Sequence, residues 1–560
     1  MQKNKQMQKK KRQNVKNVRS VIRQTVTGYA GLSLGIVLAV VGAIVTALLP
    51  PWILGSIVDT ITAGNVVPVA LVILYFAFTV LTGLTESIRE GLLTVFGQKI
   101  THALRSSMMD KYTNLTAGEL TKQEPGTIVS RFVGDVDTVE NLFTSGIISM
   151  FADACKIISI LVVIWLKNRG LAIALLVLLP FLYWFTRTVQ KNMLKAQIEN
   201  RRAVGRASGH VPETLHNIRT IHTLGKERYM EQRYDEYIAE SYRAVDRTNF
   251  YDAIYSPVIL ILNAIVVAVV MLFSASGNAR VLTLFGMSAG TAVAVVNYIS
   301  QIFTPVESLG MEIQTIQSAI AGVHRINEFY ALEELPEKYS GQKTAEPQNR
   351  TEKPFVELQN VTFGYEDDDR KILQALNFQV YPGEQVTLSG RTGAGKSTVF
   401  KLLLGLYQPG EGKVLIQGRD AFQIPENEKR SLYGYVEQTF HRVPGTVKDQ
   451  ITLYDDSFTM EEVREAARIA GLDATIEQLE KGYDTLCTSE IFSQGQWQLL
   501  SIARAAVAKP KLLLLDEITA NLDAQTEEEV LQALKRASEG RTVISISHRV
   551  NAETGRIINI

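Results

Sequence analysis

Cysteine is scarce in this chain of 560 residues, which has only Cys155 and Cys487, and these lie in different regions. They offer no disulfide framework, and neither has the neighbours of a metal site. Net charge is also nearly absent, because 58 Lys and Arg residues are balanced by 57 Asp and Glu residues. The sequence therefore argues against a disulfide-stabilised scaffold and gives no sign of a nucleic-acid partner.

The N-terminus lacks the pattern of a secretory signal. Residues 1–24 form a basic tract, and no short apolar core with a small-residue cleavage site follows it. The simplest interpretation is a solvated tail. We expect residues 1–30 to be a cytoplasmic segment, because clusters of Lys and Arg stay on that side of a membrane.

Long apolar runs are concentrated between residues 31 and 304. Crossing the hydrocarbon core of a bilayer, about 30 Å thick, takes about 20 apolar residues. Six spans are predicted, of which the fourth is the weakest because it contains Pro180: 31–58, 66–84, 142–166, 171–189, 256–275 and 281–303. Six spans return the chain to its starting side, so we expect the domain after Phe303 to be cytoplasmic.

The connections after the second and fourth spans are unusually long and helical in pattern. Helices running out and back over about 60 residues would reach roughly 40 Å from the membrane. Connections that only join two spans do not need this length. We infer that they carry force to another domain. The expected organisation is a basic segment (1–30), a transmembrane domain (31–334), a polar linker (335–354) and a soluble domain (355–560).

Two charged residues interrupt the third span. Asp153 and Lys156 are three residues apart and share a helix face, so they could form a pair. An ionisable residue within a membrane is equally a candidate functional site. Asn263, Asn297 and Gln301 could contribute polar groups to the same cavity.

The soluble domain contains a phosphate-binding loop in its required context. The stretch "VTLSGRTGAGKST" (386–398) is an apolar strand followed by the GxxxxGK[ST] pattern, and a helical stretch follows. The glycines let backbone N–H groups converge on phosphate oxygens, Lys396 reaches the β- and γ-phosphates, and the Ser397 hydroxyl takes Mg²⁺. The predicted nucleotide-binding residues are Gly390, Gly393, Ala394, Gly395, Lys396, Ser397 and Thr398.

A second stretch, "KLLLLDEITANLD" (511–523), predicts a buried parallel strand that ends in two carboxylates. Ligands sit at the carboxyl end of such strands. Asp516 would hold Mg²⁺ through water, and Glu517 would polarise the attacking water. His548 ends another predicted strand and could contact the γ-phosphate, although a histidine there is more often structural.

The order and spacing of these motifs resemble the cassette of the ATP-binding cassette (ABC) superfamily. The whole chain is similar to a half-transporter of exporter type. The resemblance implies six transmembrane helices with long cytoplasmic helical loops, fused to an α/β P-loop nucleotide-binding domain that uses ATP and Mg²⁺. It also implies that Tyr365 stacks on adenine and that Gln438 contacts Mg²⁺. Asp523 would lie in the loop that crosses to a partner cassette, and residues 114–122 and 213–220 would be coupling stretches.

The family signature LSGGQ is altered here to "FSQGQ" (492–496). In the family, two cassettes close head to tail, and the signature of one contacts the ATP of the other. The implied contacts are Ser493, Gln494, Gly495 and Gln496. The acidic, glycine-rich stretch that usually precedes the signature is replaced by "YDTLCTSEI", and the chain ends at Ile560 where many relatives continue.

An altered signature beside intact Lys396, Asp516, Glu517 and His548 favours a heterodimer. This chain would supply the catalytic base to one site, and its "FSQGQ" would face a weaker site; a tolerated glutamine in a homodimer is the alternative. We expect a multi-pass membrane ATPase, in contact with lipids, that exports or flips an amphipathic drug, lipid or small peptide. An importer on the same scaffold and an ATP-dependent sensor without net transport remain open.

Overall fold

The computed structural model describes residues 17–274, 288–335, 353–365, 370–391, 393–517, 522–546 and 555–560. Contacts divide the chain into two compact units. The first comprises Met1–Asn114 and Gln123–Leu332, and the second comprises Leu115–Lys122 and Glu333–Ile560. A short stretch from the N-terminal half of the chain therefore packs with the C-terminal domain.

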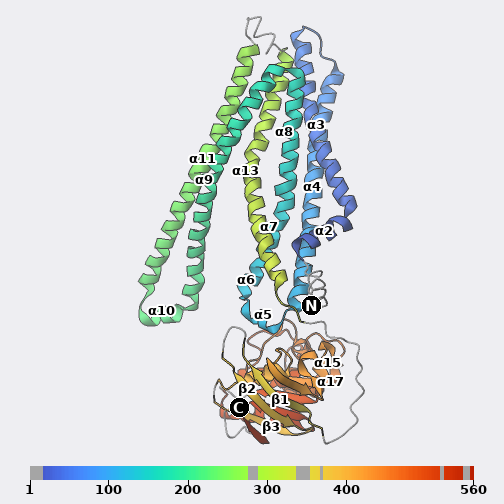
Figure 1. The fold of residues 1–560 in the computed structure, drawn as a ribbon, viewed down its shortest axis with the longest axis vertical. Helices are drawn as coiled ribbons and strands as arrows, with labels where there is room; N and C mark the ends of the chain where they lie inside the picture. Colours follow the sequence, from blue (N-terminus) through green and yellow to red (C-terminus); the bar gives the residue numbers. More distant parts are fainter. Residues whose placement is uncertain are drawn as a thin grey trace, which may run out of the picture. The chain divides into compact units, whose positions relative to one another are not determined.

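Long helices build the first unit (Figure 1). They are α2 (Val18–Gly28), α3 (Ala30–Thr62), α4 (Val69–Thr113), α6 (Pro125–Ser130), α7 (Val136–Asn141), α8 (Ile147–Lys167), α9 (Arg169–His216), α10 (Ile218–Leu224), α11 (Glu227–Ser274) and α13 (Ala289–Ala331). Two π-helical segments, η1 (Arg131–Asp135) and η2 (Leu142–Gly146), flank α7. Figure 1 shows α9 and α11 side by side, joined by α10 at the end where they diverge from α8 and α13.

Three described stretches are long and apolar enough to cross a membrane: Ala30–Thr62, Val69–Thr113 and Pro125–Lys167. The apolar part of α13, Ala289–Phe303, is shorter. The predicted span at 171–189 lies within α9, and the predicted span at 256–275 lies within α11 up to its last residue, Ser274. Residue 275 and the start of the run at 281–303 are outside the described residues. α9 continues through Pro180, which lies inside the helix.

Beyond its apolar half, α4 continues as an amphipathic helix. Leu93, Ile100, Leu104 and Met108 are almost fully buried and recur at helical spacing on one face. This stripe continues the packing of α4 against α7 and η2, and the Thr101 hydroxyl donates to the Glu140 carboxylate across it (2.6 Å). The long connections predicted from the sequence are thus continuous extensions of the transmembrane helices.

Two sheets form the core of the second unit. The first, antiparallel where its strands pair, has the order β2-β1-β4-β5, and the second is parallel, with the order β6-β7-β8-β3-β9. The strands are β1 (Val356–Phe363), β2 (Leu373–Val380), β3 (Gln385–Ser389), β4 (Glu411–Ile416), β5 (Arg419–Asp420), β6 (Tyr433–Val436), β7 (Leu512–Asp516), β8 (Thr542–Ile546) and β9 (Arg556–Asn559).

Helices surround these sheets: α5 (Ala117–Lys122), α14 (Lys396–Leu403), α15 (Glu426–Leu432), α16 (Val447–Thr452), α17 (Met460–Ala470), α18 (Asp473–Glu477), α19 (Gln494–Ala506) and α20 (Ala524–Ser538), with short 3-10 turns at Ala421–Gln423 and Gly482–Asp484. The four leucines of β7 are buried, as expected for a parallel strand covered on both faces. The carboxyl ends of β3 and β7, two strands of one sheet, therefore face the same edge.

Candidate functional site

The phosphate-binding loop joins β3 to α14. Gly393 and Gly395 have φ values of 85° and 100°, in the left-handed region that favours glycine. Lys396 begins α14 and is buried, and its Nζ donates to the carbonyl oxygens of Gly390 (2.9 Å) and Arg391 (3.2 Å). These bonds hold the ammonium group inside the curve of the loop, where it would meet an anion.

The remaining loop residues lie at the start of α14. The Ala394 N–H donates to the Arg391 carbonyl (3.0 Å), which closes the turn. Ser397 and Thr398 occupy the first turn of the helix. The backbone N–H groups of a first helical turn have no partner within the helix. Together with Lys396 they would form a cradle for the phosphates of a nucleotide.

The two carboxylates lie at the end of β7, as the sequence predicts. The Asp516 carboxylate accepts a hydrogen bond from the Tyr435 hydroxyl (3.3 Å), and burial raises the pKa of Asp516. The Glu517 carboxylate accepts from the Gln438 side-chain amide (3.3 Å). Asp516, Gln438 and the Ser397 hydroxyl offer the oxygen donors that Mg²⁺ prefers.

Tyr365 belongs to an aromatic cluster beside the phosphate-binding loop. Its ring meets those of Phe363 and Tyr407 edge to face, with centroids 5.1 and 5.4 Å apart. Its hydroxyl is 3.3 Å from the Thr398 hydroxyl, and Lys401 Nζ lies 5.2 Å from the ring centroid. The cluster therefore presents a fixed aromatic group next to the loop.

The altered signature begins α19. Ser493 caps this helix, accepting from the Gln496 N–H, while the Gln496 side chain accepts from the Ser493 N–H (2.9 Å). This capping box keeps the helix N-terminus in shape although glutamine replaces glycine at position 494. Gly495 packs against α20, and a Cβ added there would overlap the Thr526 side chain. Packing within this chain therefore requires a glycine at position 495.

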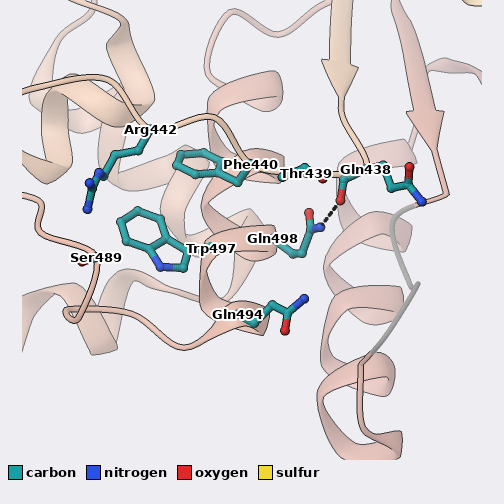
Figure 2. Close-up of a pocket in the computed structure, with 8 residues that line it drawn as sticks. All are labelled: Gln438, Thr439, Phe440, Arg442, Ser489, Gln494, Trp497 and Gln498. Atoms are coloured by element: carbon teal, nitrogen blue, oxygen red, sulfur yellow. Dashed lines mark hydrogen bonds between the residues drawn. The ribbon is translucent and has the colours of Figure 1, made fainter. Parts of the chain in front are cut away.

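Gln494 lines a cavity of about 330 Å³ within the second unit (Figure 2). The Gln438 carbonyl accepts from the Gln498 side-chain amide there (2.7 Å). The rings of Phe440 and Trp497 stack with centroids 5.2 Å apart. The Gln494 side chain thus has room inside its own cassette, in a cavity shared with the segment of Gln438.

The other predicted residues are more scattered. Asp523 caps α20 by accepting from the Thr526 N–H (3.0 Å). His548 lies outside the described residues, as does the side chain of Asn263. Asn297 is exposed on α13. The structure has no hydrogen bond or ion pair between the described side chains of Asp153 and Lys156; Asp153 instead accepts from the Ser308 hydroxyl (2.7 Å).

Sequence reasoning missed four residues at these sites: Tyr435, Tyr407, Ser308 and Glu312. Tyr435 carried a usable signal, since it lies three positions before Gln438 on the strand that leads to it. Tyr407 follows α14 by a few residues, but nothing in the sequence relates it to Tyr365. Ser308 and Glu312 lie beyond the sixth predicted span, where polar residues are ordinary.

Two families match the chain. Residues 32–306 match the ABC transporter transmembrane region, and residues 373–520 match the ABC transporter domain. The chain belongs to the ABC transporter family. The predicted resemblance and fold class are therefore confirmed. This ABC transporter chain is a multi-pass integral membrane protein of exporter type, and its cassette binds ATP and has ATPase activity coupled to transport.

Individual relatives extend the match over nearly the whole chain. The ABC transporter ATP-binding protein YfiC of Bacillus subtilis is 29% identical over 97% of this chain and 89% of its own length. An ATM1-type heavy metal exporter of Novosphingobium aromaticivorans is 29% identical over 92% of this chain and 85% of its own length. The solved structure of a bacterial Atm1-family ABC exporter with ATP bound is 25% identical, with a TM-score of 0.75 over 97% of this chain and 94% of that one.

Proposed function

We propose that this chain is one half of a dimeric ABC exporter that moves amphipathic substrates across or between the leaflets of a membrane. The observation that carries the proposal lies in the second unit. There α5, which precedes the third predicted span in the chain, packs against the cassette, and the Thr121 and Tyr407 hydroxyls are 3.5 Å apart. Tyr407 in turn contacts Tyr365. A change at the nucleotide would thus reach a segment continuous with the membrane helices.

The chemistry follows from the residues at the edge of the parallel sheet. Lys396 and the loop amides bind the phosphates, while Tyr365 presents its ring to the base. Asp516, Ser397 and Gln438 would hold Mg²⁺. When bound, ATP supplies the phosphoanhydride bond that is cleaved, and Mg²⁺ would neutralise part of the negative charge on its phosphates. Glu517 orients a water for in-line attack on the γ-phosphate, and His548 completes the predicted set.

We further propose an asymmetric dimer in which this chain supplies the working carboxylate. Glu517 lies at the end of β7 with a hydrogen bond to Gln438. The "FSQGQ" signature would face the ATP held by a partner with weakened catalytic residues. The capping box at Ser493 supports this assignment, because it preserves an N-terminus able to bind ATP while Gln494 alters the contact. A homodimer with two altered signatures is the alternative.

Transport in oriented vesicles tests the proposal. The complete dimer is reconstituted so that its cassettes face ATP added outside, and a fluorescent phospholipid or labelled tetraphenylphosphonium serves as the probe. Export predicts ATP-dependent accumulation inside the vesicle. Loss of probe from preloaded vesicles would instead support an importer. ATP hydrolysis without flux of any probe would support a sensor.

A further inference from the structure

An acidic cluster joins α8 to α13 within the first unit. Asp153 lies on α8, and its Oδ2 accepts from the Ser308 hydroxyl of α13 at 2.7 Å. Ser308 and Glu312 are four residues apart on α13, so they occupy one face of that helix. Asp153 also acts electrostatically on Glu312. The Asp153 carboxylate of α8 therefore contacts a hydroxyl group one helical turn from Glu312 on α13.

Glu312 is the unusual member of this cluster. Its side chain is nine-tenths buried, with 6% of the residue exposed. Its Oε2 is buried and has no hydrogen-bond partner among the described residues. The Oε1 of Gln301, on the same helix, is likewise buried without a described partner. Positions 301, 308 and 312 share one face of α13, so unsatisfied acceptors line this face.

The balance of donors and acceptors indicates the missing group. Two carboxylates and an amide oxygen only accept hydrogen bonds. The single Ser308 hydrogen is already directed to Asp153 or to the Pro305 carbonyl. Lys156, one turn from Asp153 on α8, makes no described ion pair with it. A buried carboxylate without a positive partner is strongly disfavoured, so something carrying positive charge has to satisfy Glu312.

We propose that Asp153, Ser308 and Glu312 form a binding site for one positive charge, supplied by a proton or by the cationic group of a substrate. This inference rests on the proposed function, because it names the substrate class for the same membrane region. A resident divalent metal fits poorly, since Mg²⁺ usually keeps several water ligands and Glu312 is buried. The described residues also include no group of three or more His, Cys, Asp or Glu side chains suited to a metal.

Both sources act through the same chemistry. Burial and the nearby Asp153 raise the pKa of Glu312, so a proton on Glu312 satisfies this carboxyl group when no substrate is present. A cationic substrate group takes its place by binding between the carboxylates, and the proton leaves. Anionic substrates would be repelled by the same oxygens. The site thus selects substrates by the sign of their charge.

The test uses two probes of the same shape and opposite charge. Binding of labelled tetraphenylphosphonium and tetraphenylborate is measured on the full-length dimer in lipid nanodiscs without ATP, so that failure of transport does not affect the result. The wild type should prefer the cation. Glu312→Gln and Asp153→Asn should each weaken cation binding by about tenfold or more, the loss expected for one charge-assisted contact. Binding of the anion should stay the same or strengthen in both variants, because each substitution removes a charge that repels it.

Three further measurements complete the design. Glu328→Gln, an exposed acid on the same helix α13, is the matched control and should leave binding unchanged. Ser308→Ala keeps both carboxyl groups and should weaken cation binding less than Glu312→Gln does. If the acidic variants fold poorly, Ser308→Ala still tests the site. Infrared difference spectra of wild type against Glu312→Gln should contain the carbonyl band of a protonated carboxyl group in the absence of cation.

The outcomes of these measurements distinguish a proton from a cationic substrate group as the source of the positive charge. Cation preference lost in Glu312→Gln, with proton release on binding, supports exchange of the proton for the substrate. An infrared band that depends on Glu312 without cation preference supports the proton alone. Equal affinity for the two probes in all variants, together with no Glu312-dependent band, overturns the proposal. In that case ATP-driven flux measured separately in vesicles still decides the proposed function.

Discussion

At the scale of single residues, Glu517 combines an unusual backbone conformation with a proposed catalytic role. Its φ of 43° lies in the left-handed region, which is costly for a residue with a side chain. The neighbouring strand holds it there, because the Glu517 N–H donates to the Ile546 carbonyl of β8 (3.2 Å). The turn at the end of β7 thus directs the carboxylate toward Gln438 rather than along the strand.

Glu517→Gln should preserve ATP binding and remove most turnover. In the proposed mechanism, Lys396 and the loop amides bind the phosphates and the Glu517 carboxylate orients water; a positioned base contributes about 10²–10⁴-fold. Nucleotide binding and phosphate release are measured on the complete dimer, with Lys396→Ala as the variant that should lose binding. Hydrolysis above about a tenth of the wild-type rate would show that another group supplies the base.

Cys487 offers a pH-dependent test of packing in the cassette. Burial raises the pKa of its thiol to about 11, so the reactive thiolate is rare at neutral pH. In a Cys155→Ser background, alkylation by iodoacetamide should accelerate about tenfold per pH unit between pH 8 and 10. The unfolded chain is the control and should level off near its ordinary pKa. A rate that levels off below pH 9 in the folded protein would contradict the burial of this thiol.

At the scale of elements, the close approach of α3 and α13 depends on small residues. A Cβ on Gly290 would overlap the Gly55 carbonyl oxygen, and a Cβ on Gly55 would come within 2.7 Å of the Gly290 carbonyl oxygen. Asp59 then accepts from the Gly290 N–H and the Ser288 hydroxyl, both at 2.8 Å. Small residues at such crossings let helix backbones come into contact.

Gly290→Ala should therefore destabilise the first unit by about 1–3 kcal/mol, the usual cost of overpacking. Gly42→Ala on α3 is the matched control, because a Cβ there has no atom within 4 Å. Alanine favours a helix over glycine by about 1 kcal/mol, so this control should be neutral or stabilising. Thermal unfolding in detergent measures both. Equal shifts in the two variants would mean that α3 and α13 do not meet at Gly55.

At the scale of the whole molecule, each compact unit contains residues from two distant parts of the sequence. Leu115–Lys122 belongs to the cassette unit, where the Thr116 N–H donates to the Glu333 carbonyl (3.2 Å). The Lys111 ammonium, in the first unit, donates to the Leu332 carbonyl (2.5 Å). The chain therefore passes between the units at adjacent points, near residues 114 and 332.

Gln494→Gly should change turnover of the complete transporter little, by less than about threefold, or about 0.7 kcal/mol of barrier. The reason is that Gln494 would contact only a site already weak in catalysis. The chain is purified alone and with its partner, and ATPase is compared before and after the substitution. If a chain that is active by itself gains tenfold or more, the altered signature limits both sites and the dimer is symmetric.

The amino-acid sequence by itself determined the chemistry of the nucleotide site and the membrane class. A phosphate-binding loop, a strand ending in two carboxylates and a helix N-cap are each formed by contiguous residues, so local sequence specifies them. The length of an apolar run is likewise a property of local sequence, and the thickness of the bilayer sets the length that a span requires. Only the tertiary structure decided three other features. These are the pairing of Asp153 with Ser308 rather than Lys156, the contact of Tyr407 with both Tyr365 and Thr121, and the burial of Glu312. Each joins elements far apart in the chain, and which faces of two helices meet depends on how all their neighbours pack.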